Sequence, residues 1–239
     1  MMNDKILIPS SVKVISFDAD DTLWENEPLF LEAEALWADV LSPYGTKEEL
    51  SARLFEVESA NMEDFGYGAK AFTLSLIQSA LEISGGKVSS EDLVRILSAG
   101  RRILHNPASP IEGVAETLET IRRSGRYFLV LMTKGDLLDQ QHKLQRSALG
   151  KYFDRVEIVS GKTEKEYSSL LSSLEVPPSA FLSVGNSFRS DIAPVLQMGG
   201  WGVYVPFRVT WEHEKVEEYP HDRLFQVDKI GDILPLLGL

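Results

Sequence analysis

The sequence predicts an α/β fold, in which a parallel sheet covered by helices is interrupted after its first strand by an all-helical insertion. Two patterns lead to this prediction. Short apolar, β-prone runs alternate with helical stretches along most of the chain, which is typical of a parallel sheet with crossover helices. Between the first of these runs and the second, residues 25–108 show helical periodicity alone.

Five apolar runs are the predicted strands. Each is followed by polar or turn-forming residues, so each strand is expected to end sharply. Ligands of open parallel sheets bind beyond the carboxyl ends of the strands. Polar clusters directly follow four of the runs, so we predict that the functional site lies at the edge of the sheet where these strands end. The runs are residues 11–17, 127–132, 155–159, 180–184 and 201–205.

The insertion reads as a series of helices. Apolar residues recur in it at helical spacing, and Thr46-x-x-Glu49 is a capping box that opens one of the segments. Glycine or Asn-Pro pairs close the later segments. We therefore expect residues 1–24 and 109–239 to form an α/β domain and residues 25–108 to form a helical domain.

Composition excludes several classes of function. Of 239 residues none is cysteine, which rules out disulfides, thiolate metal sites and cysteine nucleophiles. The longest apolar run, residues 127–132, is far shorter than the ~20 residues that span a bilayer, and the N-terminus does not resemble a secretory signal. The net charge of −12 disfavours binding to nucleic acid. We expect a cytoplasmic monomer or homodimer without a nucleic-acid or membrane partner.

The cluster after the first strand is the most informative motif. Asp18-x-Asp20-Asp21-Thr22 places three carboxylates within four residues. Carboxylates this close repel one another, so either a cation shares the site or one of them stays protonated. Oxygen ligands without cysteine favour a hard divalent ion, and Mg²⁺ fits best. A solvated acidic turn or a helix cap is the alternative for this motif taken alone.

Four motifs in order resemble those of the haloacid dehalogenase superfamily, whose members are mostly phosphatases. They are the acidic cluster, Thr133 at the end of YFLVLMT, Lys162 in SGKTEKEY, and the segment VGNSFRSD, which ends at Asp191. The resemblance covers the whole sheet portion. It implies a Rossmann-like, three-layer core, and it implies that the helical insertion is a cap that excludes water and reads the leaving group.

The resemblance also implies a role for each motif in phosphate-ester hydrolysis. Asp18 attacks phosphorus and forms an aspartyl-phosphate. Asp20 protonates the leaving oxygen and then deprotonates the water that resolves the intermediate. Thr133 donates its hydroxyl to the transferring phosphoryl group. Lys162 neutralises the charge of that group and keeps Asp18 ionised.

The implied metal is Mg²⁺, held by Asp18, the backbone carbonyl of Asp20, Asn186 and Asp191, the last of these through water or through Lys162. Many relatives have Gly-Asp where this chain has Gly-Asn. A neutral amide oxygen ligates Mg²⁺ more weakly than a carboxylate does. We therefore expect a modestly lower metal affinity.

Several lysines compete for roles at the site. Lys165 lies one helical turn from Lys162 and is the alternative to it, although Lys162 directly follows a strand and a glycine. Lys134 is expected to help bind phosphate. In the glycine-interrupted segment 61–70, Lys70 is a candidate for substrate binding, together with Asn61 and Tyr67, and a plain interhelical loop is the alternative.

The leading hypothesis is therefore a Mg²⁺-dependent phosphatase that acts on a small phosphorylated metabolite. A 2-haloacid dehalogenase-type hydrolase is the second possibility, but halide departs without a proton, so that chemistry does not need the acid Asp20. The third is a catalytically weak module that binds phosphate and metal, which only Asn186 favours.

Overall fold

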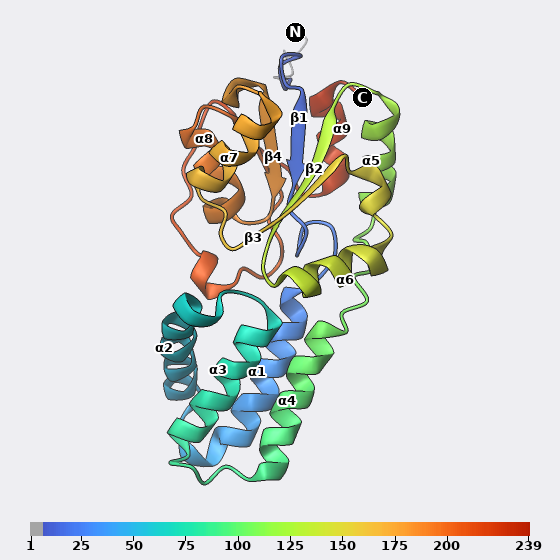
Figure 1. Ribbon diagram of the computed structural model, residues 1–239. Helices are drawn as coiled ribbons and strands as arrows, with labels where there is room; N and C mark the ends of the chain where they lie inside the picture. The colour runs from blue at the N-terminus through green and yellow to red at the C-terminus, as the bar shows by residue number, and fades with distance from the viewer. Residues whose placement is uncertain (1–6) are drawn as a thin grey trace. The chain divides into compact units, whose positions relative to one another are not determined.

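The computed structural model describes residues 7–239 (Figure 1). The contacts of the chain divide it into two compact units. The first, the sheet unit, contains the chain up to Glu25 together with Ala108–Thr133 and Leu144–Leu239. The second, the helical unit, contains Asn26–Pro107 together with Lys134–Lys143.

The sheet unit is built on a six-stranded sheet in the order β3-β2-β1-β4-β5-β6. β1 pairs in parallel with β2 and β4, and β5 pairs in parallel with β4 and β6. This confirms the predicted parallel α/β fold, with one strand, β6, that the sequence did not predict. The strands are β1 (Val14–Phe17), β2 (Phe128–Lys134), β3 (Arg155–Val159), β4 (Phe181–Gly185), β5 (Trp201–Tyr204) and β6 (Leu224–Gln226).

Helices cover both faces of this sheet (Figure 1). Alternate residues of β1 point to opposite faces, as in any strand. Ile15 and Phe17 join the core formed with α5 (Val114–Arg123) and α9 (Ile233–Leu237). Val14 joins the core formed with α7 (Glu164–Leu174) and α8 (Ala193–Gln197). The three-layer arrangement therefore agrees with a first strand that is buried on both faces.

Shorter helical elements lie between the longer ones. One is a π-helical turn, Phe188–Ile192. Such turns are rare in proteins as a whole, and many of those that occur lie at functional sites. The single-turn 3₁₀ helices are Ser42–Tyr44, Gly150–Tyr152, Pro178–Ala180, Glu212–Glu214 and Ile230–Asp232. The helix α6 (Leu137–Ser147) begins in the segment that belongs to the helical unit.

The helical unit contains α1 (Glu27–Leu41), α2 (Lys47–Phe65), α3 (Ala69–Ile83) and α4 (Ser90–Leu104). The predicted capping box is present at the start of α2, where the Thr46 and Glu49 side chains each accept a hydrogen bond from the other residue's backbone N–H. The indole of Trp37, fully buried, donates to the Leu76 carbonyl oxygen at 2.9 Å and joins α1 to α3.

The glycine-interrupted segment is shorter in the structure than its sequence suggests. The helix α2 continues through Phe65, and α3 begins at Ala69. Asn61 therefore lies on α2, buried, where its amide donates to Ser75 Oγ and Gln78 Oε1, both at 3.0 Å. Within residues 7–239 no helix combines the length and the apolar character needed to cross a membrane.

Candidate active site

The register of the sheet brings the predicted motifs to one edge. Phe17 pairs with Val184 of β4 and with Leu131 of β2. Asp18 directly follows Phe17, and its backbone N–H donates to the Val184 carbonyl oxygen at 2.9 Å. Thr133 stands two residues beyond Leu131 on β2 and is buried. The three parallel strands therefore end with their polar residues at the same, carboxyl edge.

The centre of this edge is a buried cluster of two carboxylates and one ammonium group. Lys162, in the loop after β3, donates from Nζ to Asp18 Oδ1 and, at 2.7 Å, to Asp191 Oδ1. The side chains of Lys162 and Asp191 are each only 2% exposed. Lys165, the alternative, has an exposed side chain at the start of α7. Lys162 is thus the lysine that the structure brings to Asp18.

Electrostatics keep this lysine charged. Burial alone would lower the pKa of Lys162, but the carboxylates of Asp18 and Asp191 outweigh it and raise that pKa above its ordinary range. Burial raises the pKa of Asp191, and the ammonium group of Lys162 opposes that effect. Lys162 is therefore an ammonium ion at any physiological pH, held between two acids.

The hydroxyl of Thr22 connects the first motif with the fourth. Its Oγ1 lies 3.0 Å from Asp18 Oδ2 and 3.2 Å from Asn186 Oδ1, and it accepts the backbone N–H of Asn186 at 3.1 Å. One carboxylate oxygen and one amide oxygen therefore converge on the same point. Thr22 belongs to the first motif, but its place in the sequence does not predict this role.

These oxygens suit a hard divalent cation. Mg²⁺ is usually bound by one or two carboxylates and keeps several waters, so it does not require a complete cage of side chains. No group of three His, Cys, Asp or Glu side chains arranged to hold a metal occurs within residues 7–239. The donors present, Asp18 Oδ2 and Asn186 Oδ1, fit Mg²⁺ with water ligands, and they do not fit an ion that demands a closed nitrogen or sulfur site.

Asp20 is held by a neighbour from its own turn. The indole of Trp24, fully buried, donates from Nε1 to Asp20 Oδ1 at 2.7 Å. The turn closes through Asp21, whose φ is 61°, a left-handed conformation that aspartate tolerates better than most residues. Asp20 itself is partly exposed. Its carboxyl group is thus oriented and still reachable from solvent.

Gly185 leaves no room for a side chain, because the carboxyl group of Asp191 packs against it. A Cβ at this position would lie 2.2 Å from Asp191 Oδ2. That oxygen accepts the backbone N–H of Ser187 at 3.0 Å. The hydroxyl of Tyr167 donates to the Ser190 carbonyl oxygen at 3.1 Å and supports the same π turn. Gly185 therefore leaves the space in which Asp191 reaches Lys162.

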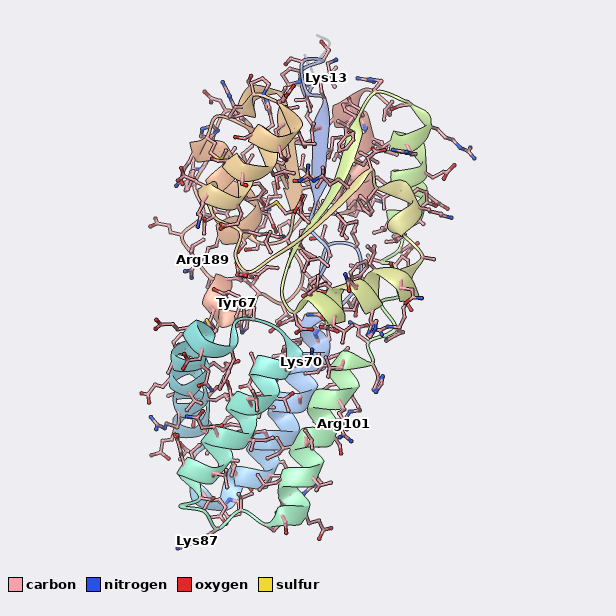
Figure 2. The ribbon with its side chains drawn as sticks, viewed as in Figure 1. Lys13, Tyr67, Lys70, Lys87, Arg101 and Arg189 are labelled. Atoms are coloured by element: carbon pink, nitrogen blue, oxygen red, sulfur yellow. The ribbon has the colours of Figure 1, made fainter. Side chains whose placement is uncertain are left out.

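The other two lysines belong to the helical unit. Lys70 pairs with Asp136, its Nζ lying 2.9 Å from Oδ1 and 3.0 Å from Oδ2. The ammonium group of Lys134 stands 4.5 Å from the centre of the Tyr67 ring, within the range of a cation–π interaction. Tyr67 and Lys70 come from the junction of α2 and α3 (Figure 2). Their roles in binding substrate stay predictions.

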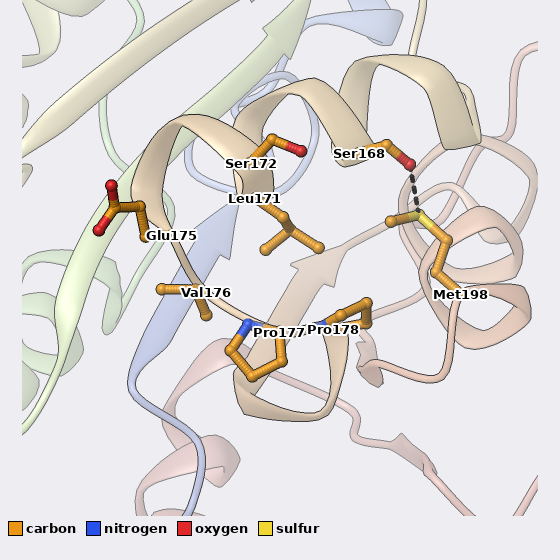
Figure 3. Close-up of a pocket in the computed structure, with 8 residues that line it drawn as sticks. All are labelled: Ser168, Leu171, Ser172, Glu175, Val176, Pro177, Pro178 and Met198. Carbon is orange, nitrogen blue, oxygen red and sulfur yellow. Dashed lines mark hydrogen bonds between the residues drawn. The ribbon is translucent and has the colours of Figure 1, made fainter.

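A cavity of about 260 Å³ lies elsewhere in the sheet unit, between α7 and the start of β4 (Figure 3). Its lining includes Ser168, Leu171, Pro178 and Met198, and Glu175 is the charged residue in it. It therefore opens near the amino end of β4, at the edge opposite to Asp18, and lacks the chemistry of the cluster.

Comparison with known proteins identifies the family. The family model of haloacid dehalogenase-like hydrolases matches residues 12–199. The chain belongs to this family. The resemblance inferred from the four motifs is thereby confirmed, and so is the assignment as a hydrolase.

Individual members show how far the likeness extends. A haloacid dehalogenase-like hydrolase of Xanthomonas campestris is 37% identical, with a TM-score of 0.85 over 95% of this chain and 91% of its own. The phosphorylated carbohydrates phosphatase of Thermotoga maritima is 29% identical over 70% of this chain and 73% of its own. The 2-haloacid dehalogenase of Pseudomonas syringae is 21% identical, with a TM-score of 0.61 over 95% of this chain and 98% of its own, and so shares the fold.

Proposed function

We propose that this hydrolase is a Mg²⁺-dependent phosphatase that hydrolyses a small phosphate monoester through an aspartyl-phosphate. The observation that carries the proposal is the pairing of Asp18, fixed by Lys162, with a second acid, Asp20, fixed by Trp24. An alkoxide leaving group needs a proton and a halide does not. An oriented acid two residues from the nucleophile therefore favours the phosphate ester.

The residues divide the reaction into two steps. Asp18, paired with the ammonium group of Lys162, attacks phosphorus with a carboxylate oxygen while Asp20 gives its proton to the departing oxygen. In the second step Asp20, now a carboxylate, takes a proton from the water that attacks the aspartyl-phosphate, which releases phosphate and regenerates Asp18. Thr133 would donate its hydroxyl to the phosphoryl oxygens.

The proposed cation would be held by Asp18 Oδ2, Asn186 Oδ1 and the backbone carbonyl of Asp20. When bound, Mg²⁺ neutralises charge between the carboxylates and the phosphoryl group. Asp191 is almost fully buried and holds Lys162 with one oxygen and the backbone N–H of Ser187 with the other, so we assign it to holding Lys162 rather than to direct ligation. The amide at Asn186 supports the expectation of a modestly weaker metal site.

Phosphorylated carbohydrates are the substrate class we favour. Support comes from the Thermotoga maritima relative, which is named for that activity. The carbohydrate part of such a substrate departs through an alkoxide oxygen, which needs a proton and so agrees with a role for Asp20. The helical unit would then act as the cap expected from the sequence, with residues 25–108 as its own domain. Lys134 and Lys70 are the cations that it could offer to an anionic substrate.

Dehalogenation remains the second candidate, because the Pseudomonas syringae enzyme has the same fold. A weak binding module is the third, because Asn186 replaces an acid. The products distinguish the three candidates. A phosphatase releases phosphate, a dehalogenase releases halide, and a binding module binds its ligand and releases neither.

The decisive experiment compares the parent with Asp18→Asn in a phosphate-release assay with an aryl phosphate and with sugar phosphates, with and without Mg²⁺. We expect Asp18→Asn to lose roughly 10³-fold or more of kcat, because the nucleophile is gone. The exposed Asp64→Asn is the matched control and should match the parent. Undiminished activity of Asp18→Asn, or halide release from 2-haloacids in place of phosphate release, would refute the proposal.

The remaining expectations from the sequence stay predictions: a monomer or homodimer, a cytoplasmic location, and no nucleic-acid or membrane partner. Size-exclusion chromatography with light scattering tests the first, and a filter-binding assay with DNA and RNA tests the absence of nucleic-acid binding.

A further inference from the structure

A segment outside the four motifs supports the site. Residues 206–222, called the strap here, connect β5 to β6 and include the 3₁₀ turn Glu212–Glu214. Nothing in the motifs involves this segment. In the sheet unit it lies against the π turn that follows Asn186, and several of its contacts are specific hydrogen bonds.

Glu214 is the centre of these contacts. Its Oε2 accepts a hydrogen bond from Ser187 Oγ and a second, at 2.6 Å, from Ser190 Oγ. Ser187 Oγ in turn accepts the backbone N–H of Ser190 at 3.0 Å. One carboxylate oxygen therefore clamps both serines of the turn. Hydrogen bonds to an ionised carboxylate are shorter and stronger than those between neutral groups.

Hydrogen bonds connect the first of these serines, Ser187, with Asp191, Lys162 and Asp18. The backbone N–H of Ser187 donates to Asp191 Oδ2 at 3.0 Å. The other oxygen of Asp191 accepts from Lys162, which also donates to Asp18. Asn186, a proposed metal ligand, directly precedes Ser187. A shift of the turn would therefore displace both the lysine's partner and the amide ligand.

Further contacts fix the strap itself. Arg208 forms a bidentate pair with Glu25, at 2.6 Å and 2.7 Å, next to the Trp24 that holds Asp20. Arg189, on the π turn (labelled in Figure 2), donates to the His213 carbonyl oxygen at 2.5 Å. The Arg208–Glu25 pair is exposed, so solvent screens it and it contributes little by itself. The carboxylate of Glu214 is partly buried, so solvent screens its hydrogen bonds less than it screens the Arg208–Glu25 pair.

We propose that Glu214 is a positioning residue for the hydrolysis: it holds Ser187 and Ser190 so that Asp191 keeps Lys162 on Asp18 and Asn186 faces the cation. This rests on the proposed phosphatase function. A π turn is a rare conformation, and here its start is closed from outside by hydrogen bonds from Ser187 and Ser190 to one carboxylate oxygen. Glu214 supplies that closure from a distant part of the chain.

The test compares Glu214→Ala and Glu214→Gln with Glu212→Ala. Glu212 is the matched control, because it lies in the same 3₁₀ turn but is exposed and paired with Lys215. We expect Glu214→Ala to lower kcat about 10- to 100-fold with a smaller change in KM, as is typical when a group supporting a ligand is removed. Glu214→Gln, which can still accept a hydrogen bond, should recover part of the loss. Glu212→Ala should match the parent.

Two further measurements separate positioning from general damage. Mg²⁺ affinity, measured by calorimetry without substrate, should fall several-fold in Glu214→Ala and not in Glu212→Ala. In a protein that already carries Ser187→Ala and Ser190→Ala, Glu214→Ala should have little additional effect, because its partners are absent. Equal kcat and Mg²⁺ affinity in Glu214→Ala and Glu212→Ala would overturn the inference. So would an undiminished effect of Glu214→Ala in the protein that carries Ser187→Ala and Ser190→Ala.

Failure of the proposed function would look different. If the parent hydrolyses no phosphate ester, the phosphatase proposal falls, and the Mg²⁺ affinities alone decide the role of Glu214. Weaker Mg²⁺ binding in Glu214→Ala would then support positioning of the cation site, and unchanged binding would refute it. If Glu214→Ala does not fold, Glu214→Gln provides the same comparison.

Discussion

Gly185→Ala is the sharpest test of the buried cluster, because a single added methyl group should displace Asp191. The new Cβ would stand 2.2 Å from Asp191 Oδ2 and 2.3 Å from its Cγ. Ordinary contacts begin at 3.4 Å, so the carboxyl group must retreat by about 1.2 Å. Asp191 Oδ1 lies 2.7 Å from Lys162 Nζ, and a displacement of that size stretches the hydrogen bond beyond its useful range.

The cost follows from the burial of the charges. Breaking a buried ion pair by removing one partner costs about 3–5 kcal/mol. Lys162 keeps Asp18 as a partner, so we place the loss of unfolding free energy near the lower end, at about 3 kcal/mol. In a protein of this size that corresponds to a fall in Tm of about 6–12 °C. Misplacing Lys162 by ~1 Å should also cost roughly 10²-fold in kcat.

Gly161→Ala is the matched control. Gly161 directly precedes Lys162, yet a Cβ there meets nothing within 4 Å. Urea unfolding, a thermal melt and phosphate release should all distinguish the two variants. If Gly185→Ala melts within about 2 °C of Gly161→Ala and keeps its activity, the tight packing of Asp191 against Gly185 is not what holds Lys162, and the reasoning fails.

Two other substitutions test the framework of each unit. Asp154 accepts from Arg122 at 2.5 Å and from the Leu129 backbone at 2.9 Å, and despite burial these donors lower its pKa. A lowered pKa contributes stability that is fully present above the unfolded value of ~3.9 and is lost as pH falls through the folded value. Asp154→Asn should therefore cost about 1 kcal/mol in urea unfolding at pH 7 and progressively less as the pH falls below ~3.9, and a cost that stays equal between pH 7 and pH 3 would contradict the pairing. Gly100→Ala should destabilise the helical unit by about 2 kcal/mol, although alanine favours helices, because its Cβ would lie 1.9 Å from Thr73 Oγ1. A stabilised Gly100→Ala in the same assay would show that Thr73 yields easily.

The sequence predicted the edge of the sheet because that prediction needs only local patterns. An apolar run followed by polar residues marks the end of a strand wherever it occurs, and parallel strands must end together. Asp18 and Lys162 are 144 positions apart, and the order of the strands alone brings them into contact. The strand β6 was missed because it has only three residues, Leu-Phe-Gln, and therefore no apolar run.

The supports of the site could not be predicted in this way. Ser187, Ser190 and Glu214 are common polar residues, and no spacing distinguishes a glutamate that clamps two serines from one that faces solvent. The same holds for the indole of Trp24, which as a buried apolar residue looks like core. Its hydrogen bond to Asp20 spans a turn in which Asp21 has a left-handed φ, and the residue types alone do not predict that φ.

The grouping of residues 134–143 with the helical unit illustrates the same limit. Periodicity ends the helical block near Pro107, and the segment after β2 resembles any other strand-to-helix connection. Its grouping comes from contacts between distant residues. Asp136 pairs with Lys70, and Lys143, buried, donates to Asn26 Oδ1 at 3.3 Å. Such pairs are visible only once the chain has folded.

The buried cluster also explains why the sheet must keep one register. Asp18, Asp191 and Lys162 come from the loops after β1, β4 and β3, so no local segment can assemble them. The side chain of Lys162 is only 2% exposed, and a buried ammonium group without its carboxylates is strongly unfavourable. A slip of β1 by one residue against β4 would turn Asp18 to the other face of the sheet and leave that charge uncompensated. The residues proposed to perform the hydrolysis therefore also select the strand pairing that creates the site.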